Sequence, residues 1–417
     1  MLGFKKNLIP KSERLFSVLD IGTEFVKAAV CEVDGKEVRV LGYARKRQNR
    51  GEMESGAITD MAGVIEKSHA ALREADRMAG TGPTPLVLGV GGEMVKGATS
   101  TISYKRRDSS SKIHQEELKN VVHKVQWKAF EKVRGDLAYE GGFNEIDVKL
   151  IHAAIVDVKV DGYKVSNPIG FQGREITMSV FNAFSPLVHY GALQTISAEL
   201  DRELLAIMAE PYAIGRILGG TELQGYSGIF IDIGGSTTDL VVVQDGSVIG
   251  TKMFNLGGRS FTKRLAQELS LSHEEAEEVK TSYSNMQLEH QSHKIITRAF
   301  ESDIDVWLAG VQLTLQEFLE LDSLPPTLYL SGGGSMLPLI KEGLEQGDWH
   351  KKLPFPRKPQ VKYLYPKQLS HIKDETGRLE SPADITPMAL ASIGMEILIE
   401  EKLLTKMLQK VVRLMQV

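Results

Sequence analysis

The sequence predicts an α/β fold made of two related halves, and three segments carry that prediction. RLFSVLDIGTEFVKAAVCEV (14–33) and GIFIDIGGSTTDLVVV (228–243) each run from an apolar strand through an Asp-x-Gly turn into a second apolar strand. LPPTLYLSGGGSMLPLIKEGL (324–344) joins a short apolar strand, through three glycines, to an expected helix near Pro338. The two hairpins lie about half a chain length apart, and this repeat implies pseudo-symmetric domains hinged around a shared site.

The two Asp-x-Gly turns have the composition of an anion site. Glycine-rich turns expose backbone N–H groups that can surround a phosphate. The aspartate that heads each turn would repel a phosphate unless a divalent cation such as Mg²⁺ lay between them. In the second hairpin the groups expected to face phosphates are Asp232 and the amides of Gly234, Gly235, Ser236 and Thr237. A tight β-hairpin that uses Asp and Gly only as turn formers is the alternative, and the second copy favours the phosphate site.

In the first hairpin, Lys27 follows Asp20 by seven residues on the returning strand. Strand alternation places Lys27 on one face with Phe25 and Ala29, and we expect its ammonium group to point back toward a phosphate. The alternative is a solvated strand lysine. In the third segment, the glycines between Ser331 and Ser335 let the backbone approach a flat ligand closely, as an adenine or a ribose requires.

These segments resemble the nucleotide-binding loops of the actin-like ATPase superfamily, in which two related α/β domains clamp a nucleotide. The resemblance implies an actin-like two-domain fold that binds ATP and Mg²⁺, with Asp20 and Asp232 holding the metal through water. It extends over nearly the whole chain. The matching positions are Asp20, Gly22, Thr23 and Lys27 in the first phosphate loop, Asp232, Gly234, Gly235, Ser236 and Thr237 in the second, and Gly332, Gly333, Gly334 and Ser335 in the adenosine loop.

Further segments extend this resemblance to residues of the reaction and the base site. Glu210, in LLAIMAEPYAIGRIL (204–218), matches the residue that positions the attacking water, so that Glu210 and Asp232 are the catalytic candidates. A strand-end carboxylate that caps the next helix is the alternative for Glu210. Glu277 and Lys280 are expected to flank the adenine and ribose; alternatively, they are i,i+3 partners on a solvated helix face.

Within the superfamily the sequence resembles the bacterial cell-division FtsA family. An insert of SHS2 type follows the helix expected at 60–80, KVSNPIGFQGREITMSVFNAF (164–184) matches the family's crossing segment, and the chain closes in an amphipathic helix. The resemblance implies at most slow ATPase activity, self-association into filaments on the inner membrane face, and tethering of FtsZ by its C-terminal peptide at the division site. A PilM-like pilus-assembly adaptor and, in a different class, a small-molecule kinase of the same superfamily are the alternatives.

This resemblance divides the chain into subdomains. Residues 263–323 form the mixed-charge helical subdomain that would recruit FtsZ, and Arg264 there replaces the acid usual in the family. We expect Arg264 to alter packing on the adenine side. The expected units are subdomain 1A (14–85 and 174–222), the inserted subdomain 1C (86–173), subdomain 2A (225–262 and 324–399), subdomain 2B (263–323) and a terminal helix (400–417).

The last segment, 401–417, has a wide apolar stripe opposite a basic face, which suits an anionic membrane surface. Packing on the protein's own core or on a neighbouring subunit is the alternative, and the part through Ile399 is assigned to the core. Composition excludes other classes: the net charge of −4 and pI near 6.3 give no reason to expect nucleic-acid binding. A single cysteine, Cys31, excludes internal disulfides and fits a cytoplasmic protein.

Overall fold

The computed structural model describes residues 14–93, 95–141, 148–165, 167–220, 225–318 and 321–399. Its first half contains β1 (Leu15–Ile21), β2 (Phe25–Asp34), β3 (Glu37–Arg47), β4 (Met53–Glu54), β5 (Ala57–Ile58), α1 (Met61–Ala79), β6 (Leu86–Val90), α3 (Leu187–Glu199), β11 (Leu204–Ala209) and α4 (Glu210–Arg216). The second half contains β12 (Gly228–Ile233), β13 (Thr238–Gln244), β14 (Ser247–Phe254), α5 (Gly258–Glu268), α6 (His273–Ser284), α7 (His290–Gln316), β15 (Thr327–Ser331), α8 (Pro338–Gln346) and β16 (Gln360–Tyr363). The insert contains β7 (Lys96–Lys105), α2 (Gln115–Gly141), β8 (Val148–Val160), β9 (Tyr163–Lys164) and β10 (Glu175–Pro186), and the chain returns to the first half through β17 (Ile372–Asp374) and α9 (Ile385–Ile399).

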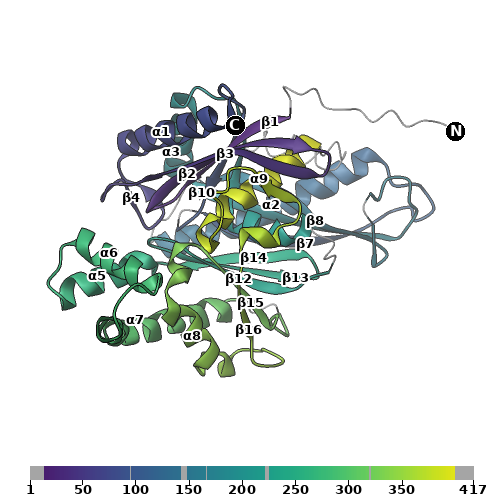
Figure 1. Ribbon diagram of the computed structural model, residues 1–417. Coiled ribbons are helices and arrows are strands. Elements are labelled where there is room, and N and C mark those ends of the chain that lie inside the picture. The colour runs from purple at the N-terminus through teal and green to yellow at the C-terminus, as the bar shows by residue number, and fades with distance from the viewer. Residues whose placement is uncertain are drawn as a thin grey trace.

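The two halves repeat one strand order (Figure 1). In the first, β1, β2 and β3 form an antiparallel meander, β6 lies parallel beside β1, and β11 lies parallel beside β6. In the second, β12, β13 and β14 form the meander, and β15 and β16 add parallel strands on the β12 side. The predicted half-chain repeat is therefore confirmed, and Asp20 and Asp232 lie at matching positions of β1 and β12.

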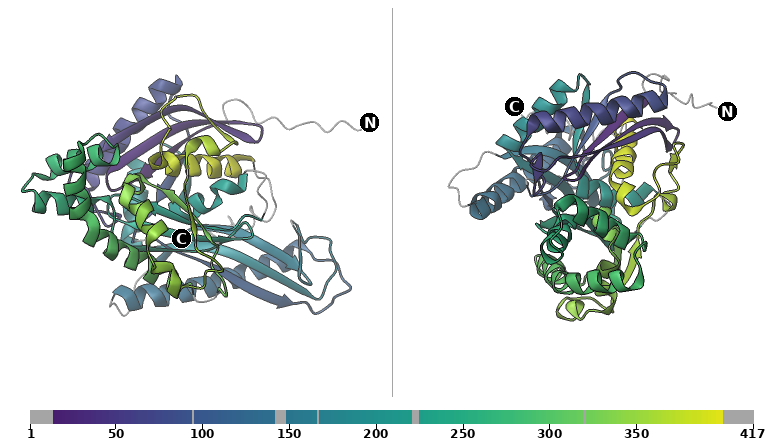
Figure 2. Two further views of the ribbon diagram at one scale, coloured as in Figure 1. Left: turned by 60° about the horizontal axis from the view of Figure 1, so that its bottom comes forward. Right: turned by 60° about the vertical axis from the view of Figure 1, so that its left-hand side comes forward.

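Helices cover both faces of the first sheet. α1 packs along one face, as the right-hand view of Figure 2 shows, and α9 packs on the other side against β1. Gly394 of α9 lies so close to the ring of Phe16 that a Cβ atom there would come within 2.2 Å of it. Pro382–Ile399 is long and apolar enough to span a membrane by length and composition, but 72% of it is buried within the fold. The assignment of the chain through Ile399 to the core is thus confirmed.

The second half has its own core between its sheet and the helices α5, α7 and α8. Its largest fully buried side chain is Trp307 of α7, whose Nε1 donates to Thr238 Oγ1 of β13 over 3.0 Å. This contact fixes α7 beneath the strand that follows the second Asp-x-Gly turn. The helices α5 and α6 lie at the outer edge of this half (Figure 1).

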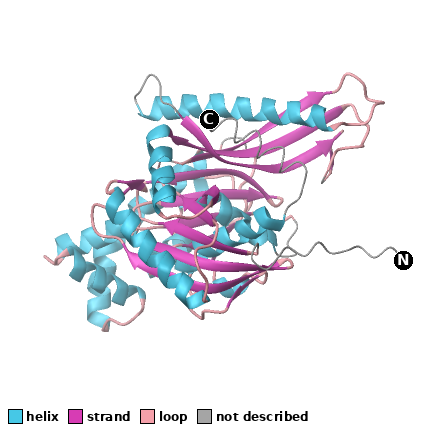
Figure 3. Ribbon diagram, turned by 90° about the horizontal axis from the view of Figure 1, so that it is seen from above, coloured by secondary structure: helices cyan, strands magenta, loops and turns pink. Residues whose placement is uncertain are grey.

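The strands of the insert continue the sheet of the second half, because β7 pairs antiparallel with β14. α2 lies along one face of β7, β10 and β8 (Figure 3). The core of the insert is a cluster of aliphatic side chains from α2 and these strands, among them Val121, Val125, Val158 and Met178. The segment at 167–171 stays within the insert, because Gly170 N donates to Ile113 O and Ile113 N donates to Phe171 O.

Strand pairing moves three of the expected boundaries. β6, at 86–90, is buried along its whole length and lies between β1 and β11, so it belongs to the first sheet rather than to the insert. β10, at 175–186, lies between β7 and β8 and belongs with the strands of the insert. β17 and α9 pack in the first half and not in the second. The insert therefore lies between β6 and α3. Residues 400–417 lie outside the described residues.

Candidate functional site

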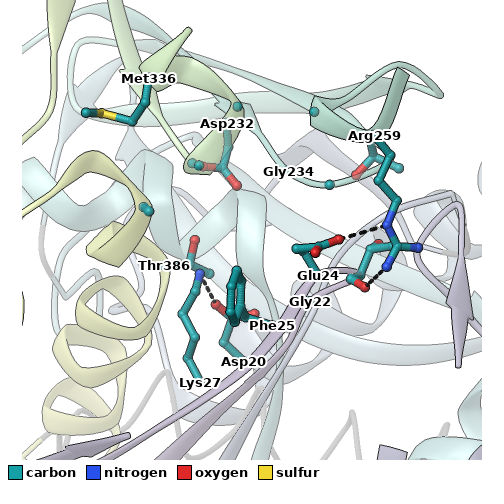
Figure 4. A pocket seen from close by; sticks show the side chains of 18 of the residues that line it. Asp20, Gly22, Glu24, Phe25, Lys27, Asp232, Gly234, Arg259, Met336 and Thr386 are labelled. Atoms are coloured by element: carbon teal, nitrogen blue, oxygen red, sulfur yellow. Dashed lines mark hydrogen bonds and ion pairs between the residues drawn. The ribbon is translucent and has the colours of Figure 1, made fainter. Parts of the chain in front are cut away.

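A cleft with a volume of about 370 Å³ lies where the two halves face each other, a size typical of small-molecule sites (Figure 4). Both Asp-x-Gly turns, the glycine turn after β15, and parts of α5 and α6 form its walls. The predicted residues that line it are Asp20, Gly22, Thr23, Lys27, Glu210, Asp232, Gly234, Gly235, Thr237, Glu277, Lys280, Gly332, Gly333 and Gly334. Segments far apart in the sequence thus form one site.

Two predicted residues do not line the cleft. The hydroxyl of Ser236 instead forms a 2.9 Å hydrogen bond with Thr23 Oγ1 of the other half. Ser335 is fully buried, and its hydroxyl donates to Gly332 O over 2.7 Å. Both hydroxyl groups therefore brace the turns, whereas the expected contacts of the Ser236 amide and of the adenosine loop that ends at Ser335 stay predictions.

The first turn holds a compact ion pair. Gly22 N donates to Phe25 O over 3.1 Å, and a Cβ atom at Gly22 would lie 2.9 Å from that same oxygen. Lys27 Nζ reaches back across the hairpin and donates to Asp20 Oδ2 over 3.1 Å, whereas its expected contact with a phosphate stays a prediction. Burial opposes the charge of Lys27, but attraction to Asp20 and other carboxylates outweighs it, so the pKa of Lys27 lies above its usual value.

The second turn presents carboxylates instead of an ion pair. Asp232 Oδ1 accepts a 2.7 Å hydrogen bond from Ser331 Oγ, and Asp239 lies opposite Asp232 on β13, at the position that Lys27 holds in the first hairpin. Burial raises the pKa of Asp232. Burial, together with the charge of Asp232, raises the pKa of Asp239 to about 7. The two hairpins thus share a backbone arrangement but differ in charge: the first pairs Asp20 with Lys27, and the second places Asp232 opposite Asp239.

Glu210 begins α4 at the base of the cleft. Burial raises its pKa, and the charges of Asp20 and Asp232 add to this shift. Glu210 is the acidic residue in the first turn of α4, as the helix-capping alternative requires, but no side-chain hydrogen bond caps this helix. Glu210 Oε1 is buried without a hydrogen-bond partner. The carboxylate of Glu210 fits here because residue 89 is a glycine. A Cβ atom on Gly89 would lie only 2.7 Å from Glu210 Oε1.

The donor set fits a hydrated magnesium ion. Within the described ranges, no group of three or more His, Cys, Asp or Glu side chains is close enough to hold a metal directly. Mg²⁺ usually keeps several of its waters and takes one or two carboxylates. Asp20 and Asp232 on opposite walls, with the unpartnered oxygen of Glu210 nearby, match that requirement.

The glycine turn after β15 packs tightly against the second Asp-x-Gly hairpin. Gly332 has a φ of +82°, and a Cβ atom there would lie 2.4 Å from Ile233 O. Gly334 is equally close, because its Cβ atom would lie 2.4 Å from Ile233 Cγ2. Gly332 and Gly334 thus permit a close approach to the second hairpin, and the close approach to a flat ligand that the sequence suggested stays a prediction.

Replacing Gly332 by alanine is expected to lower the free energy of unfolding by about 2–5 kcal/mol, because steric overlap adds to the strain of the positive φ. Gly377 is the matched control: its φ is +64°, but nothing lies within 4 Å of a Cβ atom there. Gly377→Ala is expected to cost about 1 kcal/mol. Urea unfolding of both variants measures the difference, and equal losses would contradict the proposed packing.

Glu277 and Lys280 line the cleft and also pair with each other. Lys280 Nζ donates to Glu277 Oε2 over 2.7 Å, to Thr262 Oγ1 over 2.8 Å and to Gly258 O over 3.0 Å. The two side chains are only 12% and 16% exposed, which excludes the solvated helix face. Arg264 does not line the cleft. It forms bonds of 2.7–3.1 Å with Asp303 of α7, so its expected effect on adenine packing is not supported.

Sequence reasoning missed several residues of the walls. Glu24 and Phe25 lie within the first Asp-x-Gly segment, and Arg259 directly follows a glycine pair at the start of α5. Figure 4 shows Arg259 reaching from the second half to Glu24 of the first. For Glu24 and Arg259 the available signal was a charged side chain beside a phosphate-type turn, whereas Phe25 carried no such signal. Met336 and Thr386 also line the cleft, but nothing in their local sequence indicates this position.

Comparisons with known proteins agree with this geometry. The family model described as cell division protein FtsA matches residues 229–383. Cell division protein FtsA of Neisseria meningitidis serogroup B is 26% identical over 278 residues, which are 66% of this chain and 62% of that protein. FtsA of Bacillus subtilis is 23% identical over 272 residues, 64% of this chain and 58% of that protein. The matched regions thus span about three fifths of these relatives.

Among solved structures, a "PilM-PilN type IV pilus biogenesis complex" superposes with a TM-score of 0.65 at 19% identity, covering 93% of this chain and 100% of that one. This match shows the fold. The chain is therefore a protein of the actin-like fold, with two α/β halves around a shared cleft. Within that class its sequence is similar to the cell-division protein FtsA, over residues 229–383 for the family model and at 26% identity for the Neisseria protein.

Proposed function

We propose that the protein binds ATP with Mg²⁺ in the cleft and acts as an FtsA-like cell-division protein. The observation that carries the nucleotide proposal is the convergence of two Asp-x-Gly turns and a glycine turn on one cleft. Turn amides and Lys27 supply positive charge for phosphates, and the buried carboxylates supply ligands for a hydrated cation. The site requires both a nucleotide and a metal ion, because the buried carboxylates would repel the phosphates of a nucleotide that lacked a metal.

Each residue has a role in this proposal. Lys27 neutralises phosphate charge, and Asp20 and Asp232 would hold Mg²⁺ through its waters, which supplies charge neutralisation at the phosphates. Glu210, whose raised pKa and unpartnered oxygen suit a hydrogen bond with water, orients a water molecule near the phosphates. Positioning and electrostatics are what phosphoryl transfer requires. Slow turnover is expected if ATP mainly controls how far the two halves close.

The cell-division part of the proposal comes from the FtsA relatives. The matched family region, 229–383, contains the second Asp-x-Gly turn, α5 to α7 and the glycine turn. As an FtsA-like protein, the chain would form filaments on the inner membrane face through 401–417. It would tether the C-terminal peptide of FtsZ through the helical region 263–323.

Electron microscopy of the purified protein on an anionic lipid monolayer tests this function. Filaments that require ATP and Mg²⁺, and that vanish when the chain ends at Glu401, are the expected result. Binding of a fluorescent ATP analogue, measured with Mg²⁺ and with excess EDTA, tests the cleft separately. A protein that binds no nucleotide under either condition would exclude the proposal, and a bare monolayer with intact nucleotide binding would exclude only its membrane part.

A PilM-like adaptor is the second candidate, and one observation favours it: the PilM fold aligns with 93% of this chain. Such an adaptor would bind a short peptide of an inner-membrane pilus protein instead of FtsZ. Fluorescence anisotropy with the two labelled peptides separates the candidates. Saturable binding of the FtsZ peptide supports the first, and saturable binding of the pilus peptide alone supports the second.

A further inference from the structure

One side chain crosses the cleft with three hydrogen bonds. Arg259, in the first turn of α5, donates from Nε to Glu24 Oε2 over 2.9 Å and from Nη2 to Thr23 O over 2.8 Å. Its Nη1 also donates to Met53 O over 3.3 Å. All three acceptors belong to the first half, and two belong to its Asp-x-Gly turn. The guanidinium group of Arg259 therefore ties the second half to the first turn.

The backbone of Arg259 is attached just as firmly to the second turn. Arg259 N donates to Gly235 O over 2.7 Å, and the neighbouring Gly258 N donates to Gly234 O over 2.9 Å. A single residue thus contacts both phosphate-type turns, one with its backbone and the other with its side chain. A change in the spacing of the turns must stretch or break these bonds.

The two turns also contact each other directly. Thr23 Oγ1 and Ser236 Oγ lie 2.9 Å apart, and a Cβ atom at Gly235 would lie 3.3 Å from Glu24 Cβ. Glu24 is held from its own side as well, because Arg47 Nε donates to Glu24 Oε1 over 2.9 Å. Glu24 is thus a shared acceptor for a cation of each half, with a side chain only 18% exposed.

Electrostatics in the cleft oppose this contact. Asp20 and Glu210 of the first half line the same cleft as Asp232 and Asp239 of the second. Within the described part of the chain, Lys27 forms an ion pair with Asp20. Without a bound cation, like charges on the two walls favour separation of the halves.

We propose that Arg259 is a positioning residue: with Glu24 and the carbonyls of Thr23 and Met53 it forms a latch that holds the two phosphate turns together against this repulsion. The latch matters most when no cation or nucleotide is bound, because Mg²⁺ would neutralise the carboxylates. Its effect on nucleotide exchange rests on the proposed ATP site, whereas its effect on the spacing of the turns rests on the contacts alone.

Hydrogen–deuterium exchange of the nucleotide-free, full-length protein tests the latch. In Arg259→Ala, peptides that contain residues 22–25 and 234–237 are expected to exchange roughly 5- to 30-fold faster, the factor that corresponds to losing one or two kcal/mol. Arg259→Lys keeps the charge but cannot reach three acceptors, so it should show an intermediate rate. With ADP and Mg²⁺ bound, the difference between Arg259→Ala and the original protein should shrink.

Arg264→Ala is the matched control, because Arg264 lies on the same helix and its partner Asp303 belongs to the same half. It is expected to loosen α5 and α7 and to leave the two turns unchanged. If Arg259→Ala folds cooperatively and its turns exchange as slowly as the original protein's, the proposal is wrong. Should Arg259→Ala fail to fold, Glu24→Gln removes the shared charge and is judged by the same exchange rates.

Stopped-flow release of a fluorescent ADP analogue gives an independent readout. We expect release from Arg259→Ala to be roughly 5- to 30-fold faster than from the original protein, and release from Arg264→Ala to be unchanged. A protein that binds no nucleotide would overturn the proposed function, yet the exchange data would still decide whether the latch exists. Unchanged release from Arg259→Ala, with nucleotide binding intact, would overturn the coupling.

Discussion

Asp239→Asn is expected to stabilise the nucleotide-free protein at pH 8 by up to about 4 kcal/mol and to have little effect at pH 4. The pKa of Asp239 is raised from 3.8 to about 7 by burial and by Asp232, an interval that corresponds to about 4 kcal/mol. Since the folded protein binds this proton more tightly than the unfolded chain, stability falls as pH rises through the interval. Asparagine keeps an oxygen for the 3.4 Å contact from Thr237 Oγ1 but carries no charge.

Urea unfolding of both proteins at pH 4, 5, 6, 7 and 8, without nucleotide or metal, measures the effect. The advantage of Asp239→Asn should grow steadily across this range. Asp305→Asn, at an exposed carboxylate of α7, is the control and should show no such trend. A stability difference that stays constant with pH would mean that burial and Asp232 do not raise the pKa of Asp239 in the folded protein. Added Mg²⁺ should narrow the difference, because a cation in the cleft relieves the same repulsion.

Lys27→Met is expected to destabilise the protein and to weaken nucleotide binding. It leaves Asp20, whose side chain is 4% exposed, without its ion-pair partner. Removing one partner of a buried pair costs about 3–5 kcal/mol. The loss should be largest at pH 8 and smaller at pH 5, because protonation of the neighbouring carboxylates relieves the repulsion that Lys27 otherwise offsets. Affinity for a fluorescent ATP analogue is expected to fall by roughly a hundredfold or more, which two charge-assisted hydrogen bonds would account for.

Lys252→Met is the control for this substitution, because Lys252 pairs with Glu317 at the surface with side chains 42% and 55% exposed. Exposed pairs contribute about 0–1 kcal/mol, so this variant should be nearly as stable as the original protein and bind nucleotide equally well. If Lys27→Met kept full affinity for the ATP analogue, the assignment of the cleft as a phosphate site would fail. Unfolding curves recorded with and without the analogue separate a loss of binding from a loss of folded protein.

Local sequence determined the two hairpins and the glycine turn. An Asp-x-Gly turn between apolar strands has few alternative conformations, since Gly22 must leave room for Phe25 O, and Lys27 must lie beside Asp20 once the hairpin closes. The half-chain repeat of this pattern then predicted two like sheets around one cleft, and the strand order confirms it. These features depend on contacts between residues that are close in the sequence, and such contacts can be predicted from local sequence alone.

Contacts between distant segments were decided only by the tertiary structure. The LVLGV run of β6 reads equally well as the start of the insert or as a central strand, and pairing on both sides made it a strand of the first sheet. Arg264 was expected to affect packing on the adenine side, but its side chain bonds to Asp303 of α7. Arg259, five residues earlier, bonds instead to Glu24 of the other half. Both are arginines of one helix. Their different partners follow from the faces that α5 presents to α7 and to the cleft, and helix orientation is a property of packing rather than of local sequence.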